Sequence, residues 1–284
     1  MAPTYRRTGF VALLGALAAC ARAPNGSKDF PPADLTFSVK SGAVTGPDSV
    51  APGWARVRVA EDGGGHIVVI FRLPESASDA DIAVFLAALD TADATPAPAV
   101  ALGGPEVGDI GDVVVQLTSG RYVLGCVRRG WTGHRHASRG EAKVLVVLNA
   151  PVTAGRDAPP VATQEMQMVD FAYVGPERWP AGSHMLRVQN GGSQEHQLRL
   201  ARLRPGSSLN DWMNAGDPNK IATPIAGVAR LGPGGVAYLP VELAAGDYVA
   251  YCLITDRKSG RTHVELGMFR GIKVDAKGSR DSLS

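Results

Sequence analysis

The sequence predicts an all-β protein that consists of two tandem β-sandwiches, each with a short helical insert. Glycine and proline are abundant, with 34 and 20 copies in 284 residues, and short valine-rich runs recur between turn signals. This pattern is typical of sandwiches and argues against helical bundles and parallel sheets. The two halves of the chain are also similar to each other, which indicates a duplicated unit.

The internal similarity is strongest around two cysteines. Residues 117–126 (LTSGRYVLGC) match residues 243–252 (LAAGDYVAYC). A few residues later, 136–141 (HASRGE) match 263–268 (HVELGM). In each half, a tyrosine and a cysteine lie on what the pattern predicts to be one strand, and a histidine lies in the loop that follows.

Both halves also contain an earlier histidine, His66 and His196, which follows a glycine-rich turn. Each half therefore has a histidine, a cysteine and a histidine in the same order. We predict one sandwich over residues 35–149 and a second over residues 166–275. The segment 150–165 contains three prolines and lacks a core pattern, so we interpret it as the linker.

A helical insert is expected between the earlier histidine and the cysteine of each half. Ser78 and Ser208 are good N-cap residues, and each precedes aspartate in what would be the first turn. In the first insert, four apolar side chains fall on one helix face, namely Ile82, Phe85, Leu86 and Leu89.

The N-terminus resembles a bacterial lipoprotein signal. Arg6 and Arg7 precede a short apolar run that ends in the box Leu17-Ala-Ala-Cys20. The run is too short to predict a membrane-spanning helix and fits a signal peptide. The resemblance implies a lipid on Cys20 that attaches the protein to a membrane outside the cytoplasm. An ordinary signal peptide with an incidental cysteine is the alternative. We assign residues 1–19 to the signal, 20–34 to a flexible tether and 276–284 to a polar tail.

The charge of the chain gives no reason to expect nucleic acid as a partner. Loss of residues 1–19 lowers Lys plus Arg from 29 to 27, which equals the 27 Asp plus Glu. A neutral chain lacks the excess of positive charge that typically binds phosphate backbones.

The segment from Cys252 to Met268 carries the strongest chemical signal. Cys252, His263 and Met268 follow one another in a turn-rich loop, and His196 lies upstream. One cysteine and two histidines with a weak methionine partner form the ligand set of a blue-copper site. This order resembles that of the cupredoxin family. The ten residues between Cys252 and His263 exceed the spacing in the small electron carriers and are closer to the nitrite-reductase type of loop.

The resemblance implies Greek-key, cupredoxin-like domains and a copper ion in the second half. Its ligands would be His196, Cys252, His263 and Met268. Zinc is the second candidate metal, because cysteine and histidine also bind zinc. Taken singly, each of these residues has a plainer explanation in core packing or in a turn.

The first half has the corresponding residues His66, Cys126 and His136, with Glu141 in place of the methionine. A carboxylate is a hard oxygen donor that suits oxidised copper better than cuprous ion. Two interpretations stay open for this half, a weaker metal site or a metal-free structural copy. The plainer interpretation of Glu141 is a surface residue at the end of the loop.

Two further expectations concern single residues. Cys126 and Cys252 are candidates for a disulfide in an exported protein. Because they occupy the same place in two copies, each is expected to face its own core, so we favour two separate thiols. His184 is expected at the surface of a strand.

The leading functional hypothesis is a lipid-anchored copper protein that transfers single electrons to a redox partner protein or holds the ion. A metal-free scaffold lipoprotein is the alternative. Two-domain nitrite reductases and small laccases, which share the repeat layout, place a histidine directly beside the copper cysteine. Here Cys126 lies between Gly125 and Val127, and Cys252 lies between Tyr251 and Leu253, so the sequence disfavours catalysis.

Overall fold

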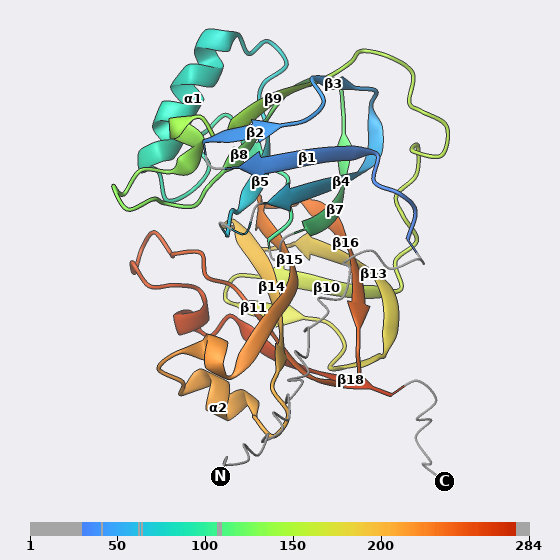
Figure 1. The fold of residues 1–284 in the computed structure, drawn as a ribbon, viewed down its shortest axis with the longest axis vertical. Coiled ribbons are helices and arrows are strands. Elements are labelled where there is room, and N and C mark those ends of the chain that lie inside the picture. The colour runs from blue at the N-terminus through green and yellow to red at the C-terminus, as the bar shows by residue number, and fades with distance from the viewer. Residues whose placement is uncertain (1–29, 41, 62, 64, 107–109, 277–284) are drawn as a thin grey trace, which may run out of the picture.

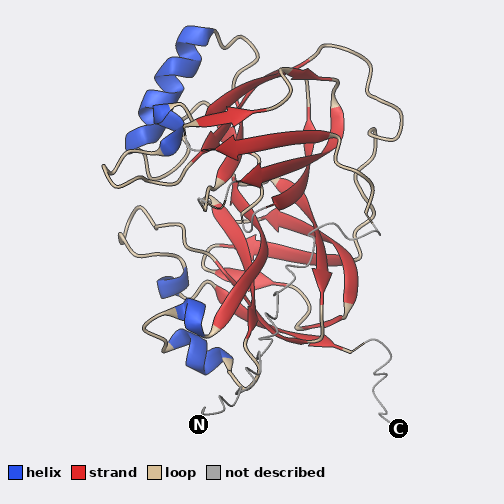
Figure 2. Ribbon diagram, viewed as in Figure 1, coloured by secondary structure: helices blue, strands red, loops and turns tan. Residues whose placement is uncertain are grey.

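The computed structural model describes residues 30–276 except 41, 62, 64 and 107–109. Most of its regular structure is β-strand, and the short helices lie at the periphery (Figure 2). The predicted all-β fold is therefore confirmed. The predicted signal peptide, its Cys20 and most of the tether and tail lie outside the described residues. None of the helices that are described has the length and apolar character needed to span a membrane.

The elements of the first half are β1 (Leu35–Lys40), β2 (Ala43–Thr45), β3 (Ser49–Val50), β4 (Gly53–Glu61), β5 (Val68–Arg72), α1 (Asp79–Thr91), β6 (Val100–Ala101), β7 (Ile110–Leu117), β8 (Gly120–Cys126), η1 (His136–Arg139) and β9 (Ala142–Val147). The elements of the second half are β10 (Gln164–Val169), β11 (Ala172–Val174), β12 (Arg178–Pro180), β13 (Gly182–Asn190), β14 (His196–Leu203), α2 (Leu209–Met213), η2 (Pro218–Lys220), β15 (Ala222–Leu231), β16 (Val236–Leu243), β17 (Gly246–Tyr251), η3 (Val264–Leu266) and β18 (Phe269–Asp275).

Each half is a sandwich of two sheets, and the strand order is the same in both. One face consists of β2-β1-β4-β7 in the first half and β11-β10-β13-β16 in the second. The opposite face is β3-β9-β8-β5-β6 in the first half and β12-β18-β17-β14-β15 in the second. The chain changes sheet repeatedly, as Greek-key connections require. The predicted duplication is therefore visible in the strand pairing (Figure 1).

Local details repeat as well. The hydroxyl of Tyr122 donates to the carbonyl of Thr118, at 2.8 Å, and that of Tyr248 donates to Ala244, at 2.7 Å. In both copies this bond ties the strand that leads to the cysteine back to the preceding turn, and it satisfies a buried polar atom. The tyrosine rings fill the centre of each core.

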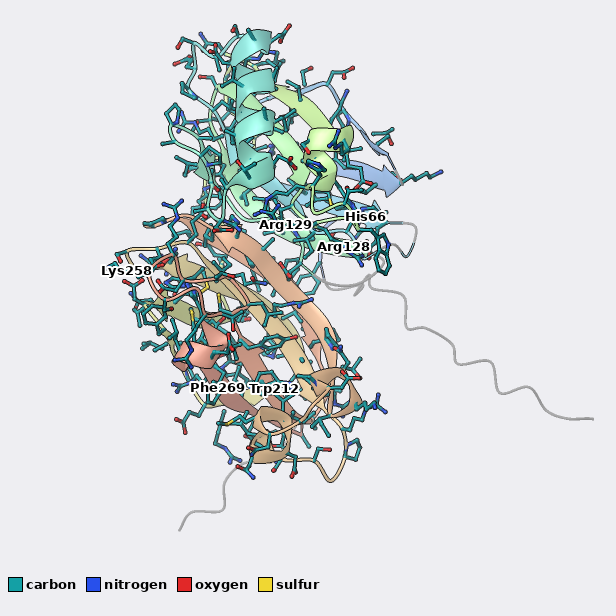
Figure 3. The ribbon with its side chains drawn as sticks, turned by 90° about the vertical axis from the view of Figure 1, so that its left-hand side faces the viewer. His66, Arg128, Arg129, Trp212, Lys258 and Phe269 are labelled. Carbon is teal, nitrogen blue, oxygen red and sulfur yellow. The ribbon has the colours of Figure 1, made fainter. Side chains whose placement is uncertain are left out.

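The two helical inserts are capped as predicted. Ser78 and Ser208 each accept a hydrogen bond from the backbone N–H of an aspartate three residues later, and that aspartate bonds back to the serine, forming a capping box. Ile82, Phe85 and Leu89 are buried, and α1 packs with them on the outer face of its five-stranded sheet. In the second half, Trp212 of α2 packs near Phe269, with ring centroids 6.3 Å apart (Figure 3).

The two sandwiches are joined edge to edge rather than by the linker alone. β7 pairs with β16 in antiparallel fashion, so the two four-stranded faces become one eight-stranded sheet. Across this joint, the ring of Trp54 packs edge-on against that of Tyr238, with the ring centroids 5.3 Å apart. Counted inward from either end of this sheet, corresponding strands of the two halves follow in the same order, as expected when two similar units meet through matching edges. The joint also covers two edges that would otherwise be open to pairing with other chains.

A second joint lies on the other side of the molecule. Residues 101–106 run between β5 of the first sandwich and β15 of the second and bond to both. The N–H of Gly103 donates to the carbonyl of Arg230, while Gly103 accepts from Ile70. The carbonyl of Gly104 accepts from Ala229 at 2.7 Å. The two sandwiches therefore contact each other through backbone bonds on both faces.

We predict that Gly104→Ala destabilises the protein by about 3 kcal/mol, the upper part of the range for overpacking. A Cβ at this position would lie 2.0 Å from the carbonyl oxygen of Val68, a backbone atom with no room to move away. Gly216→Ala is the matched control, because its Cβ would meet nothing within 4 Å and no positive φ restricts it. Urea denaturation measures both, and equal stability of the two variants would contradict the prediction.

Candidate metal centres

The second sandwich brings three predicted ligands together at one end. His196 begins β14, Cys252 directly follows β17, and His263 lies in the loop that returns to β18. All three side chains have no exposed surface. Because β14 and β17 are antiparallel neighbours, the start of β14 and the end of β17 lie together, and residues far apart in the sequence meet there.

The donor atoms of this group face one another. His196 Nδ1 lies 3.0 Å from His263 Nδ1, and His263 Nδ1 lies 3.4 Å from the sulfur of Cys252. Potential ligand atoms of the three residues all lie within 4.8 Å of one another. Met268 is also fully buried, and its N–H donates to the carbonyl of His263 at 2.8 Å, which fixes the end of the loop.

The orientation of His196 depends on a residue that sequence reasoning missed. His196 Nε2 lies 2.9 Å from Oδ1 of Asp170, in the turn between β10 and β11. A carboxylate only accepts, so Nε2 carries the proton and the neutral ring keeps the lone pair of Nδ1 on the side of His263. Asp170 also accepts from Ser193. The sequence signal was weak, because an aspartate in a hairpin turn is commonly only a turn residue.

Burial keeps these ligands uncharged. It raises the pKa of the Cys252 thiol to about 12. Burial, and then the neighbouring His196, lowers the pKa of His263 to about 4. Burial also lowers the pKa of His196, although Asp170 opposes this. At Asp170 burial acts to raise the pKa, but hydrogen bonds from Ser193 and His196 outweigh it and lower the pKa to about 2.

The first sandwich gathers its four predicted residues in the same way. The sulfur of Cys126 lies 3.7 Å from Nδ1 of His66 and 3.7 Å from Nδ1 of His136. The group of His66, Cys126, His136 and Glu141 again has ligand atoms within 4.8 Å of one another. Burial raises the pKa of the Cys126 thiol to about 11.

The position of Glu141 contradicts the plainer interpretation of this residue from the sequence. It is buried, with 6% of its surface exposed, and not a surface residue at the loop end. Its Oε2 accepts from Nδ1 of His66 at 2.8 Å and from Nδ1 of His136 at 2.9 Å, while Oε1 accepts from the N–H of Gly42 at 3.0 Å. The carboxylate therefore lies among the nitrogen donors, and the second half has Met268 at the corresponding sequence position.

The two cysteines and His184 complete the comparison with the sequence predictions. Cys126 and Cys252 are both buried free thiols, as favoured over a disulfide. His184 is not at the surface. It is 4% exposed, and its Nε2 donates to the carbonyl of Pro180 at 2.7 Å. Among the described residues, the two histidine-cysteine groups are the clusters with metal-ligand character.

Comparisons with known proteins give structural neighbours only. No family model matches the chain, and no curated protein matches it. An auracyanin from Roseiflexus castenholzii is 22% identical, with a TM-score of 0.28 over 39% of this chain and 94% of that one. Auracyanin A, a blue copper protein from Chloroflexus aurantiacus, is 15% identical, with a TM-score of 0.26 over 39% and 99%. A copper-containing nitrite reductase from Thermus scotoductus is 14% identical, with a TM-score of 0.25 over 88% and 62%. These values carry no argument about function, which has to come from the two residue groups.

Proposed function

We propose that the chain is an extracytoplasmic copper protein that carries single electrons or holds the ion, with a blue-copper-like site in the second sandwich. The observation that supports this most directly is the buried meeting of His196, Cys252 and His263 through Nδ1, Sγ and Nδ1. Two imidazoles and a thiolate form a donor set that suits copper, with zinc as the second candidate. Copper bound there would supply a one-electron couple.

The separations between donor atoms fit one ion. Bonds of about 2.0 Å to nitrogen and 2.3 Å to sulfur place donors about 3.3–3.7 Å apart around a single metal. The observed separations of 3.0 and 3.4 Å in the second group, and 3.7 Å in the first, are close to these values. Because the thiols are protonated at neutral pH, metal binding is expected to release a proton from each.

The first sandwich is proposed as a second, chemically different site. Its donors are His66, Cys126, His136 and Glu141, and the carboxylate favours oxidised copper. A site with this oxygen donor should hold cupric ion in preference to cuprous ion. The methionine at the corresponding place in the second site favours the reduced ion instead.

A copper titration of the purified full chain tests the proposal. We expect two binding steps, with an intense visible charge-transfer band from the second site and a distinct or weaker spectrum from the first. If the protein binds zinc but shows no visible band when copper is added, zinc would be the favoured metal. Absence of any copper binding would favour the alternative function, a metal-free scaffold protein.

Asp170→Asn should weaken copper binding at the second site by about 10- to 100-fold, the usual effect of losing a partner that orients a ligand. An amide can accept from or donate to a ring nitrogen, so it no longer fixes the proton on Nε2 of His196. Nδ1 is then no longer held in the unprotonated form that binds a metal. Asp247→Asn is the control, since Asp247 is a half-exposed strand residue paired with Lys273. Competition with a chelator measures both affinities, and an unchanged affinity in Asp170→Asn would reject the orienting role.

Anchoring through a lipid on Cys20 belongs to the same proposal, and the lipoprotein-like leader supports it. The wild type is expected to enter the detergent phase in phase partitioning, whereas Cys20→Ser should remain in the aqueous phase. Expression in a bacterium that processes lipoproteins is needed for this comparison. A Cys20→Ser protein that still partitions with detergent would contradict lipidation.

Electron transfer also requires a redox partner protein, and we propose that it docks near the first site. Trp131 lies in the loop between Cys126 and His136 and is fully exposed. An exposed aromatic ring of this size is uncommon on a soluble surface and is often found where proteins associate. Nucleic acid is not part of the proposal, because the mature chain carries no net charge.

A further inference from the structure

A pocket lies between the two sandwiches and borders both metal centres. Its volume is about 270 Å³, which exceeds several times the roughly 30 Å³ that a water molecule occupies in the liquid. Ile67 and Val127 line it from the first sandwich, and Gln197 and Leu253 line it from the second. Each of these four residues directly follows a candidate ligand. An occupant of the pocket would therefore contact residues that are the sequence neighbours of candidate ligands in both metal centres.

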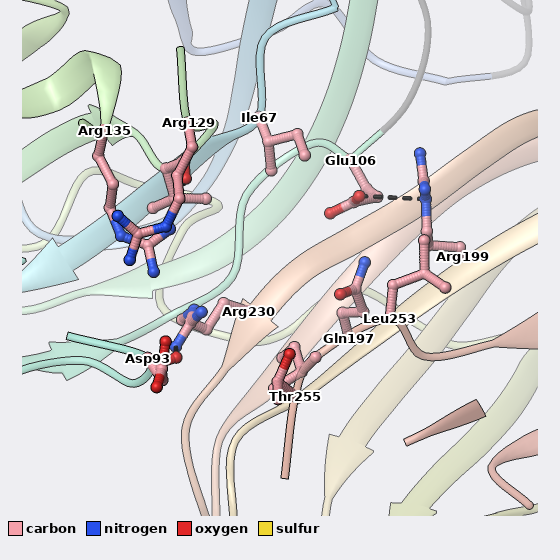
Figure 4. A pocket seen from close by; sticks show the side chains of 12 residues that line it. Ile67, Asp93, Glu106, Arg129, Arg135, Gln197, Arg199, Arg230, Leu253 and Thr255 are labelled. Atoms are coloured by element: carbon pink, nitrogen blue, oxygen red, sulfur yellow. Dashed lines mark hydrogen bonds and ion pairs between the residues drawn. The ribbon is translucent and has the colours of Figure 1, made fainter. Parts of the chain in front are cut away.

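Most of the charged residues that line the pocket are arginines. Four guanidinium groups face it, from Arg129, Arg135, Arg199 and Arg230, against the acids Asp93 and Glu106. In Figure 4, Arg129 and Arg135 extend side by side from the first sandwich, with Arg230 and Asp93 below them. Arg135 is within electrostatic reach of both Arg129 and Arg230.

Two of these cations already have acidic partners. The side chains of Arg199 and Glu106 approach to 3.1 Å, the contact marked in Figure 4. Arg230 bonds to Glu195 at 2.6 Å and to the carbonyl of Asp93. Burial raises the pKa of Glu106 to about 7, although Arg199 lowers it, so this acid offsets less positive charge than an ordinary carboxylate does.

Among the described residues, no carboxylate is bonded to the guanidinium group of either of the other two cations. Arg135 donates through Nε, Nη1 and Nη2 to three backbone carbonyls, those of Leu89, Val127 and Ala92. Arg129 donates through Nη1 to the carbonyls of Asp90 and Gly133. Carbonyl dipoles satisfy the hydrogen bonds but do not cancel the charges. The nearby carboxylate of Asp90 is itself bonded to His134 and Ser138.

The guanidinium groups of exposed Arg129 and buried Arg135 repel each other, and an anion between them would offset this repulsion. Arg129 keeps Nε and Nη2 available, and so does Arg230, because in each only Nη1 takes part in a bond between described residues. A guanidinium edge of this kind matches the paired oxygens of an oxyanion.

We propose that the pocket binds a small oxyanion of the phosphate type between the two metal centres. Arg129 and Arg230 would contact its oxygens directly, and Arg135 would contribute charge from a fixed position. The inference does not depend on copper, because the arginines and the cavity exist in the metal-free chain. It adds a ligand site for an anion to a protein whose other two sites are suited to cations.

Isothermal titration calorimetry of the metal-free full chain with inorganic phosphate, in a low-chloride buffer, tests this site. We expect one saturable event per chain that weakens as salt rises. Arg129→Gln should reduce the affinity by about tenfold or more, as loss of a charge-assisted hydrogen bond predicts. Arg178→Gln is the control. It removes one positive charge from the exposed ion pair between Arg178 and Asp275, which does not line the pocket, and this variant should bind phosphate as the wild type does.

Three outcomes would overturn the proposal. They are absence of saturable binding, equal affinity in Arg129→Gln and wild type, and chloride binding as tight as phosphate binding. The thermal midpoint of Arg129→Gln shows whether it is folded. If it is not, Arg129→Lys keeps the charge but loses the flat guanidinium edge, and an undiminished affinity in that variant would also reject direct contact.

Discussion

Replacing Cys252 with serine is expected to abolish the visible charge-transfer band of the second site and to weaken cuprous ion binding by more than about 100-fold, beyond the usual effect of losing an orienting partner. The thiolate is the only soft, strongly donating ligand in that group, and His196 and His263 cannot replace it. Serine has nearly the same volume, so the fully buried position should stay filled. Absorption of the copper-loaded variant and competition with a cuprous chelator measure the two effects.

Cys126→Ser is the matched control for this change. It alters the corresponding thiol in the first sandwich, which is also fully buried and is the last residue of the corresponding strand, β8. The band of the second site should persist in this variant. If Cys126→Ser removed the main band while Cys252→Ser kept it, the first sandwich would hold the coloured site. Circular dichroism of both variants separates loss of metal from loss of fold.

Much of the fold and the ligand grouping could be predicted because both depend on local pattern. The helix starts followed from serine N-caps with aspartate three residues later, a signal contained within four residues. The ligand groups followed from repetition, since residues at matching places in two copies of one fold meet at matching places in space. His66, Cys126 and His136 therefore come together although they resembled a family pattern only loosely.

What could not be predicted depends on contacts between distant segments. The joint between β7 and β16 forms because two exposed edges meet, and nothing in the alternation of either strand marks it as an edge that pairs. Asp170 acts on His196 from another hairpin, and buried His184 contacts Thr163, 21 residues earlier in the chain, at 3.3 Å. Composition also gave no sign that arginines from both halves line one pocket, since the net charge of the chain is close to zero.

Glu141→Gln is expected to weaken cupric ion binding at the first site by about 100-fold and to leave the second site unchanged. The substitution keeps the shape of the side chain and its acceptor for the N–H of Gly42, but removes the negative charge that lies 2.8 and 2.9 Å from the two imidazole nitrogens. A hard anionic oxygen contributes more to the binding of cupric than of cuprous ion. The loss should therefore be larger for the oxidised metal, and the reduction potential of the first site should rise.

The corresponding change in an unrelated acid provides the control. Glu165→Gln removes one negative charge from β10, where the side chain is two-thirds exposed and lies 3.9 Å from Arg187. It should alter neither site, so a general effect of net charge would appear in both variants. If Glu141→Gln bound cupric ion as tightly as the wild type, the carboxylate would serve only to hold the two histidines in the metal-free protein. The two sites would then differ in their surroundings but not in their oxygen donor, and the expected difference in their potentials would have to come from Met268 alone.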